Sequence, residues 1–459
     1  MKHVNYYNPG LFLISMNKYN MNIKASLLLL LFALLAVSAC NNSTIDKLSD
    51  VEILHQNQDQ LTQVIIYDVF NPPVASRIYA YTSLASYEAM RFQQPESVSF
   101  ASQLNGFEPM PVPQMGKKYD FTLAATRAFF TVVHKVVFSV DSLTTYEDKV
   151  YARFKNSLSK EVYERSVLFG DSVGQAVLAR SAGDNYKQTR GMPKHLGDNL
   201  AGRWRPTGPD YADGAEAYWG SIKPLLLDSA ELANVPELRV PKFNMEPESD
   251  YYKEVMSLYN VTNNLTEEQK EIAKYWDDNP FVVEHSGHMM IGNKKITPGG
   301  HWMGITAIAS RQANADPVKT AKAYAAAAVA MYDGFICCWN LKYKYNTVRP
   351  VTVINEKIDN KWQPMLQTPP FPEYPSGHST ITSAAATVLT KMFGDDFAFE
   401  DTSDLRYIGM KRNFKSFRQA ADEASISRVY GGIHYRFSVD EGVVEGKKVG
   451  NKVIEKFQL

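Results

Sequence analysis

The sequence predicts an all-α protein, with one large helical domain over residues 51–459. Apolar residues recur mostly at the three- and four-residue intervals of a helix face, and few stretches alternate as strands do. Helix-start residues support this prediction, because Asp316-Pro317 and Thr266 pair good N-caps with runs of helical spacing. The 45% apolar and 21% charged fractions are those of a globular protein.

The charge balance narrows the classes of partner. Lysine plus arginine and aspartate plus glutamate both number 49, so the formal net charge is zero. No global field would attract nucleic acid or an acidic membrane surface, and we expect no nucleic-acid partner. Any positive field must be local to a site.

The N-terminus has the pattern of a targeting segment. Lys24 precedes an apolar run over residues 27–37, which is too short for a stable membrane span. Val37-Ser38-Ala39-Cys40 resembles a bacterial lipobox, with Cys40 as the lipidated first residue. An ordinary secretory signal is the alternative. In the lipoprotein interpretation, residues 1–39 are the signal peptide, with Met16 or Met21 as possible starts. Residues 40–50 form a tether. We expect a protein of the cell envelope outside the cytoplasm, with its lipid anchor as the sole membrane contact.

The N-terminal half is expected to contain long helices and then an irregular but ordered segment. The segment over residues 189–250 has several prolines and two tryptophans, and the tryptophans argue against disorder. The expected helices cover 51–91 with a break at Asn71-Pro72-Pro73 and a restart at Val74, then 121–140 and 142–188.

The C-terminal half is expected to contain shorter helices separated by functional loops. Gly431-Gly432 should end one helix, with His434 near the start of the next. Arg349 precedes a proline and is biased away from helix. The expected helices cover 266–276, 317 to Lys342, 379–393, 405–430 and a last one ending at Phe457.

The cysteines and the scattered histidines carry little chemistry in this sequence. Adjacent Cys337 and Cys338 rarely meet disulfide geometry, so we expect buried free thiols. His285 and His288 could share a metal ion, but no third ligand can be named and packed or solvated histidines are the default. His301 follows Pro298-Gly299-Gly300 and is expected to have a local structural role.

Pro375-Ser376-Gly377-His378 stands at the start of a predicted helix. The first free N–H groups of a helix, with its dipole behind them, bind anions. Ser376 adds a hydroxyl, Gly377 lets an oxyanion approach the backbone, and His378 can titrate near neutral pH. By itself this tetrapeptide is better explained as an ordinary helix start without chemistry.

Two flanking motifs make an anion site the better interpretation. Upstream, Lys342 and Arg349 form Lys-x6-Arg-Pro. Downstream, Ser427-Arg428 and His434 form Ser-Arg-x5-His. Arginine offers a planar fork to two oxygens and lysine a point charge, so the set suits a compact oxyanion. The candidate site residues lie within 339–440.

These three motifs, in this order, resemble the signature shared by vanadium-dependent haloperoxidases and the type 2 phosphatidic acid phosphatase (PAP2) superfamily. The resemblance implies a large all-α bundle of the acid phosphatase and haloperoxidase type. In the haloperoxidases such residues bind vanadate, which is the implied cofactor. Carried over, His434 would bond the metal and His378 would be the acid/base. The residues that would hold the oxygens are Lys342, Arg349, Ser376, Gly377 and Arg428.

The implied reaction of a haloperoxidase is the oxidation of a halide by hydrogen peroxide to hypohalous acid, with vanadium as a Lewis acid. The catalytic set would be His378, His434, Arg428 and Lys342. Phe371 falls seven residues before His378, where chloroperoxidases have Phe and bromoperoxidases His. With Trp339, it would line a halide pocket.

Two alternatives stay open. In the phosphatases the same cradle holds the phosphate of a phosphomonoester, and the residue corresponding to His434 forms a phosphohistidine. Those enzymes usually orient it with an aspartate four residues later, where this chain has Ser438, with Asp440 the nearest acid. The group that orients His434 is therefore open. The second alternative is a non-catalytic lipoprotein that binds phosphate-bearing ligands. The extended helical region before Lys342 favours the haloperoxidase. Asp277 or Asp278 is a hypothetical partner of Arg428.

Overall fold

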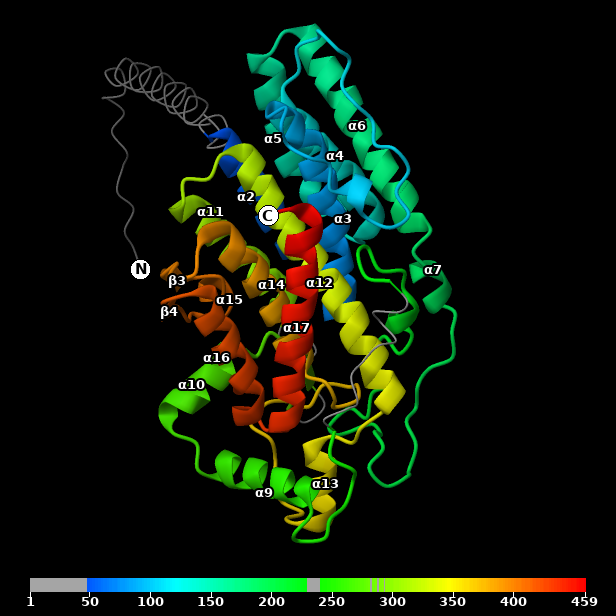
Figure 1. Cartoon of the computed structure of the whole chain (residues 1–459), viewed down its shortest axis with the longest axis vertical. Coiled ribbons are helices and arrows are strands. Elements are labelled where there is room, and N and C mark those ends of the chain that lie inside the picture. Colours follow the sequence, from blue (N-terminus) through cyan, green and yellow to red (C-terminus); the bar gives the residue numbers. More distant parts are fainter. Residues whose placement is uncertain (1–47, 229–239, 281–282, 287–288, 293) are drawn as a thin grey trace, which may run out of the picture. The chain divides into compact units, whose positions relative to one another are not determined.

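The regular elements of the structure are mostly helices (Figure 1). The computed structural model describes residues 48–228, 240–280, 283–286, 289–292 and 294–459. The helices before residue 300 are α2 (Asp50–Tyr67), α3 (Pro72–Met90), α4 (Phe121–Val136), α5 (Asp141–Ser157), α6 (Lys160–Ala182), α7 (Tyr186–Thr189), α9 (Asp250–Asn263), α10 (Glu267–Tyr275) and α11 (Pro298–Gln312). The later helices are α12 (Pro317–Tyr345), α13 (Pro350–Lys357), α14 (Gly377–Phe393), α15 (Leu405–Ile408), α16 (Phe417–Tyr430) and α17 (Arg436–Phe457).

Helix α12 is the central element of the described fold. Asp316 caps it by accepting a hydrogen bond from the Lys319 N–H, and Pro317 takes its first position, as predicted. Its alanine-rich middle is buried on every side, which lets α3, α14, α11 and α17 pack around it (Figure 1). The helix runs three residues past Lys342, and Asn346 in a left-handed conformation ends it. Arg349 therefore lies outside α12, at the N-cap position of α13 just before Pro350.

Helices α14 and α17 lie in close contact through a row of glycines on α17. Gly442, Gly446 and Gly450 face α14 at four-residue intervals. A Cβ atom at Gly446 would lie 2.2 Å from the Thr380 carbonyl oxygen, a distance that side chains do not adopt. Glycine is thus required for the two backbones to come this close. The approach matters because the start of α14 carries Ser376 and Gly377, and α17 begins just after His434.

Four short strands form two hairpin-like sheets in the described residues. Strand β1 (Val283–Ser286) pairs antiparallel with β2 (Met289–Gly292), and β3 (Phe399–Asp401) pairs antiparallel with β4 (Arg412–Phe414). The prediction of one helix over 405–430 was therefore wrong. Gly409 adopts a left-handed conformation and ends α15, which frees β4 to pair with β3 before α16 begins.

The long predicted helices of the N-terminal half are also shorter than expected. Ser159 caps α6 and so divides the predicted 142–188 helix, and Asn185 separates α7. Helix α4 ends at Val136, not 140. The prolines 72 and 73 open α3 instead of preceding it, because a first turn tolerates proline. Thr266 caps α10 in a capping box, as its sequence predicted.

The irregular segment before α9 is ordered where it is described. Trp204 and Trp219 are fully buried, and the Trp204 N–H donates to the Asn346 carbonyl just past α12. Residues Ser49–Leu459 cluster as one compact unit. Cys337 and Cys338 are buried free thiols, as predicted. No helix in the described part of the chain is long and apolar enough to span a membrane. Cys40, the signal peptide and His288 lie outside the described residues, and the structure does not describe the side chain of His285.

Candidate active site

The three sequence motifs meet at the start of α14. Ser376 is the N-cap of α14, and its hydroxyl oxygen accepts hydrogen bonds from the Ser379 N–H and the Ser379 hydroxyl. These two bonds leave the Ser376 proton available to another acceptor. Gly377 occupies the first helical position, so its N–H has no partner within the helix turn. A Cβ there would lie 3.4 Å from the Trp339 ring, an ordinary contact distance, so the indole packs directly against this helix start.

His434 is held by a carboxylate that its sequence context did not identify. Its Nδ1 lies 2.9 Å from the Glu373 Oε1, which also accepts the Tyr435 N–H. A proton on Nδ1 therefore leaves the lone pair of Nε2 open toward the site. The Ser438 hydroxyl is 3.5 Å from the same Nδ1, so it is a marginal partner. Asp440 pairs with Arg436.

Glu373 could have been suspected from the sequence alone, since it lies only five residues before His378 in the segment that enters the cradle. Nothing in the spacing, however, shows that the chain folds back to place it beneath His434. Burial raises the pKa of Glu373 to about 7, with Arg349 and Lys342 opposing that rise. Burial and the neighbouring Arg349 hold the pKa of His434 well below its ordinary value, so the imidazole is neutral.

Lys342 supports the cradle in this structure by holding its backbone. The buried ammonium donates to the carbonyl oxygens of Pro372, Glu373 and Pro375, the segment that leads into Ser376. Its three protons are thus matched by three carbonyls. Burial lowers the pKa of Lys342 to about 7. The predicted residue is therefore at the site, with its donors directed at the loop.

Arg349 retains a free donor. Its Nε donates to the Phe371 carbonyl and its Nη1 to the Ile433 carbonyl, and Nη1 lies 3.3 Å from the His434 Nε2. Its Nη2 is buried with no partner among the described residues. Burial lowers the pKa of Arg349 to about 10, so the guanidinium stays charged at neutral pH. A buried guanidinium with an unmatched N–H suits an anionic ligand.

Arg428 contacts the chain where it leaves α10. It donates to the Trp276 carbonyl and, through Nε at 3.0 Å, to the Ser427 hydroxyl. The hypothesis of a direct partner in Asp277 or Asp278 was wrong. Asp277 pairs with Lys295, and Asp278 with His301. Both carboxylates still act on Arg428 through space, because they oppose the effect of burial, which lowers its pKa to about 10.

His378 is neutral in this setting. Burial is the main cause that lowers its pKa well below the ordinary value, and the nearby Arg428, His301 and Lys342 add to it. The Trp276 backbone opposes this lowering of the pKa. Among the described residues the His378 Nε2 has no hydrogen-bond partner, and it lies 4.0 Å from the Asp278 Oδ2. An anion bound between these cations would raise the pKa of His378 and let it carry a proton.

The pocket wall contains both predicted aromatic residues. Trp339 and Phe371 line one cavity together with His378, Arg428 and His434. Their ring centroids are 4.9 Å apart. The Phe371 ring also faces the cations, with the Lys342 Nζ at 5.1 Å and the Arg349 Cζ at 4.9 Å from its centroid. The lining is apolar on this side and polar at the helix start.

These residues fit a compact tetrahedral oxyanion. Arg428, the helix start at Gly377 and two neutral imidazoles line one cavity, and the buried cations Lys342 and Arg349 lie 5.1 and 4.9 Å from the Phe371 ring in its wall. Among the described residues, two buried nitrogens, the Arg349 Nη2 and the His378 Nε2, have no hydrogen-bond partner. Buried polar atoms are usually satisfied, so unmatched donors in a cationic pocket indicate a missing anionic partner.

Comparison with known proteins places this geometry in a family. Residues 322–459 match a family model described as the VCPO second helical-bundle domain. A vanadium-dependent bromoperoxidase of Ascophyllum nodosum is 30% identical over 94 residues, which is 18% of this chain and 17% of the length of that relative. The matched stretch thus covers a small part of the bromoperoxidase.

Solved structures extend the likeness to most of the chain. A bacterial vanadium-dependent iodoperoxidase is 44% identical with a TM-score of 0.83, covering 88% of this chain and 96% of its own. A holo-type bacterial vanadium-dependent chloroperoxidase has a TM-score of 0.66 at 18% identity, covering 84% of this chain and 92% of its own, and shows the shared fold. Since the first relative is similar over nearly its whole length, the chain belongs to the vanadium-dependent haloperoxidase family.

Proposed function

We propose that this protein is a vanadate-dependent haloperoxidase that uses hydrogen peroxide to oxidise a halide to hypohalous acid. The observation that carries the proposal is the His434 imidazole, which Glu373 fixes with its Nε2 facing a buried cationic pocket. That arrangement supplies a metal ligand and the charge to hold an oxyanion in one place. The 44% identical iodoperoxidase supports the proposal over nearly its whole length.

Each side chain has a role that follows from its geometry. Arg349, Arg428 and the start of α14 would hold the oxygens of vanadate, and the neutral Nε2 of His434 would bond the metal. Bound vanadium supplies Lewis acidity toward peroxide without a change of its own oxidation state. His378 would hold or move the proton at its Nε2, the atom without a partner. Lys342 fixes the loop from Pro372 to Pro375.

The atypical Ser438 position does not weaken the proposal. An inactive relative would be expected to have lost the group that orients its histidine. Here the carboxylate of Glu373 supplies that group from another part of the chain. The absence of an acid at Ser438 is therefore no argument for a non-catalytic lipoprotein.

For the halide, we propose iodide as the preferred substrate. Iodide is the most easily oxidised of the three common halides, and the 44% identical relative is an iodoperoxidase. Trp339 and Phe371 would form the apolar wall against which the halide approaches. A large, weakly hydrated anion suits an apolar wall better than chloride does.

A paired assay on residues 41–459 tests the function. One arm adds vanadate, hydrogen peroxide and either iodide, bromide or chloride, and follows halogenation of a reporter dye. The other arm omits vanadate and follows hydrolysis of an aryl phosphate. We expect vanadate-dependent turnover that is fastest with iodide and absent in His434→Ala. Phosphate release that vanadate inhibits, without halogenation, would refute the proposal in favour of a phosphatase. Silence in both arms would favour a binding protein.

We also propose that the protein is a lipoprotein of the cell envelope, anchored through Cys40. The support is the sequence alone, in which Val37-Ser38-Ala39-Cys40 follows a leucine-rich run. Expressed with its leader, the protein should fractionate with membranes, and Cys40→Ser should move it to the soluble fraction. An unchanged membrane fraction in that variant would refute the anchor.

A further inference from the structure

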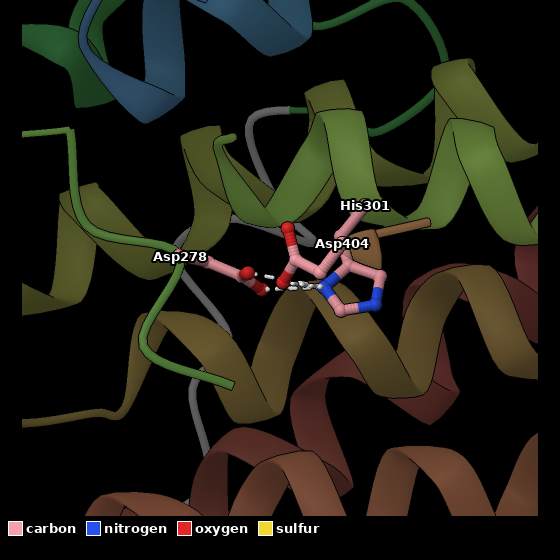
Figure 2. A group of neighbouring side chains, drawn as sticks. All are labelled: Asp278, His301 and Asp404. Carbon is pink, nitrogen blue, oxygen red and sulfur yellow. Dashed lines mark hydrogen bonds and ion pairs between the residues drawn. The ribbon is translucent and has the colours of Figure 1, made fainter. Parts of the chain in front are cut away.

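The buried His301 has two carboxyl groups, those of Asp278 and Asp404, on the Nδ1 side of its ring (Figure 2). The His301 Nδ1 lies 3.0 and 3.2 Å from the two oxygens of Asp278, and its Nε2 lies 2.9 Å from the Asp401 Oδ2. The Asp404 Oδ2 is farther, at 3.6 Å from Nδ1. A ring that faces a carboxylate at each nitrogen can satisfy both only when both nitrogens carry a proton.

The charge of this ring follows from the same contacts. Burial opposes an imidazolium, but the carboxylates of Asp278 and Asp401, which contact its two nitrogens, outweigh burial and raise the pKa of His301 well above its ordinary value. Burial and the other two carboxyls raise the pKa of Asp404 to about 8, so this carboxyl is mainly protonated at neutral pH. The cluster is then two carboxylates bridged by one cation.

His301 contacts the turn from Trp276 to Asp278. This turn lies outside the three sequence motifs but adjoins the active site. The His301 ring stacks on the Trp276 ring at 4.5 Å and 19°. The Trp276 carbonyl in turn accepts a hydrogen bond from Arg428, and Asp278, two residues further on, has its Oδ2 4.0 Å from the His378 Nε2. His301 therefore holds both ends of the turn from Trp276 to Asp278, since it stacks on the Trp276 indole and bonds the Asp278 carboxylate.

That turn has a strained backbone. Asp278 has a φ of 36°, a left-handed conformation that residues with a side chain rarely adopt. Such a conformation persists only when the surrounding structure over-determines it. The bidentate contact with His301 is such a constraint, and it directs the Asp278 Oδ2 toward the His378 Nε2 at 4.0 Å.

We propose that His301 is a positioning residue for the reaction: clamped between Asp401 and Asp278, it fixes the Trp276–Asp278 turn and so holds the Asp278 carboxylate near His378. This inference rests on the proposed function for its catalytic consequence. Held in this way, Asp278 presents a fixed negative charge to His378, while the bound anion is held by other groups. The loss of His301 should therefore affect turnover more than anion affinity.

Kinetics and binding, measured on the same variants, test this split. We expect His301→Gln to lower kcat for iodide oxidation by about tenfold or more, the scale of effect seen when groups behind a metal site are removed. The Kd for vanadate, measured by calorimetry, should change less than threefold. His134→Gln is the matched control, because it removes another histidine–carboxylate pair, with Glu147, at a site outside the pocket.

A second pair of variants covers a failure of His301→Gln to fold. Asp401→Asn removes one carboxylate but leaves every residue of the pocket in place, and should lower kcat similarly. Asp404→Asn makes the same chemical change at a carboxyl that is already protonated, and should stay within about twofold of wild type, since a neutral isosteric swap changes no charge. Equal effects of the two would overturn the clamp.

Spectra of the vanadate-free protein give a readout independent of turnover. With ¹⁵N-labelled histidine, both ring nitrogens of His301 should carry protons at pH 7.5 in wild type, and Asp401→Asn should lower the pH at which one is lost. A neutral His301 in wild type would overturn the proposal. So would a stoichiometric divalent cation that disappears in Asp404→Asn, because Nδ1 cannot hold both a proton and a metal ion. A protein that oxidises no halide would refute the proposed function alone, and the spectra would still decide the clamp.

Discussion

At the residue scale, the site depends on how few atoms fix the state of His434. One carboxylate oxygen of Glu373 accepts from the imidazole and from the Tyr435 N–H. The alternative group, the Ser438 hydroxyl, is at the limit of a hydrogen bond. Glu373 thus orients the histidine, a role that an aspartate four residues after the histidine has in the phosphatases. It does so from a segment 61 residues earlier in the chain.

We therefore expect Glu373→Gln to weaken vanadate binding about ten- to a hundredfold, the usual cost of losing a group that orients a metal ligand. The amide keeps the shape of the side chain but not its charge, so the Nδ1 proton is held less firmly. Calorimetric titration of vanadate into the purified protein measures the effect. Ser438→Ala is the control and should stay within about threefold of wild type. A larger loss in Ser438→Ala than in Glu373→Gln would contradict this assignment.

At the element scale, the position of α14 depends on the glycines of α17. The Gly-x3-Gly-x3-Gly spacing at 442, 446 and 450 gives α17 a face without side chains toward α14. The start of α14 carries Ser376 and Gly377, while His434 lies just before α17. Any increase in the separation of these helices therefore changes the distance between two halves of the cradle.

Gly446→Ala should destabilise the protein by about 1–3 kcal/mol, because the added Cβ would overlap the Thr380 carbonyl and force the helices apart. This loss would exceed the gain of about 1 kcal/mol that alanine normally brings to a helix. Urea unfolding followed by circular dichroism measures the change. Gly191→Ala, at a glycine with open space around its Cβ position, is the control and should be nearly neutral. A stabilised Gly446→Ala would show that the helices are not in limiting contact.

At the scale of the whole molecule, the cradle makes the free energy of unfolding depend on pH. Lys342 is buried, and its pKa falls from 10.5 to about 7 on folding. The folded protein then binds fewer protons than the unfolded chain between these values, so stability rises as the pH rises from about 7 toward 10.5. Glu373 acts in the other direction: its pKa rises from 4.5 to about 7, so the stability it contributes at low pH is lost as the pH rises through about 7.

The difference in unfolding free energy between wild type and Lys342→Met should therefore change with pH. The wild type should gain a few kcal/mol relative to the variant between about pH 7 and pH 10, since each unit of pKa shift is worth about 1.4 kcal/mol. Urea unfolding of both vanadate-free proteins at several pH values gives the difference. Repeating the series with Lys344→Met controls for the general loss of a lysine, because Lys344 is exposed in the same helix turn. A pH-independent difference would mean that Lys342 is charged throughout.

The fold class, the helix starts at Asp316-Pro317 and Thr266, and the three motifs that meet at the start of α14 could be predicted from the sequence. Those features depend on local chemistry, since caps, prolines and apolar spacing act within a few residues. Glycine effects were harder to foresee: Gly409 interrupts a stretch whose apolar spacing is helical, and pairing with β3 gives the freed residues their hydrogen bonds.

The groups that orient the cradle residues from distant parts of the sequence could be identified only from the tertiary structure. Glu373 reaches His434 across 61 positions of sequence, and His301 reaches Asp401 across 100. Such pairs have no sequence spacing, because they form when helices far apart in the chain pack together and exclude water. The same burial sets the charge of each group: it makes His434 neutral, while the carboxylates around His301 keep that ring protonated. The chemistry of a histidine in this protein is therefore a property of its neighbours in space.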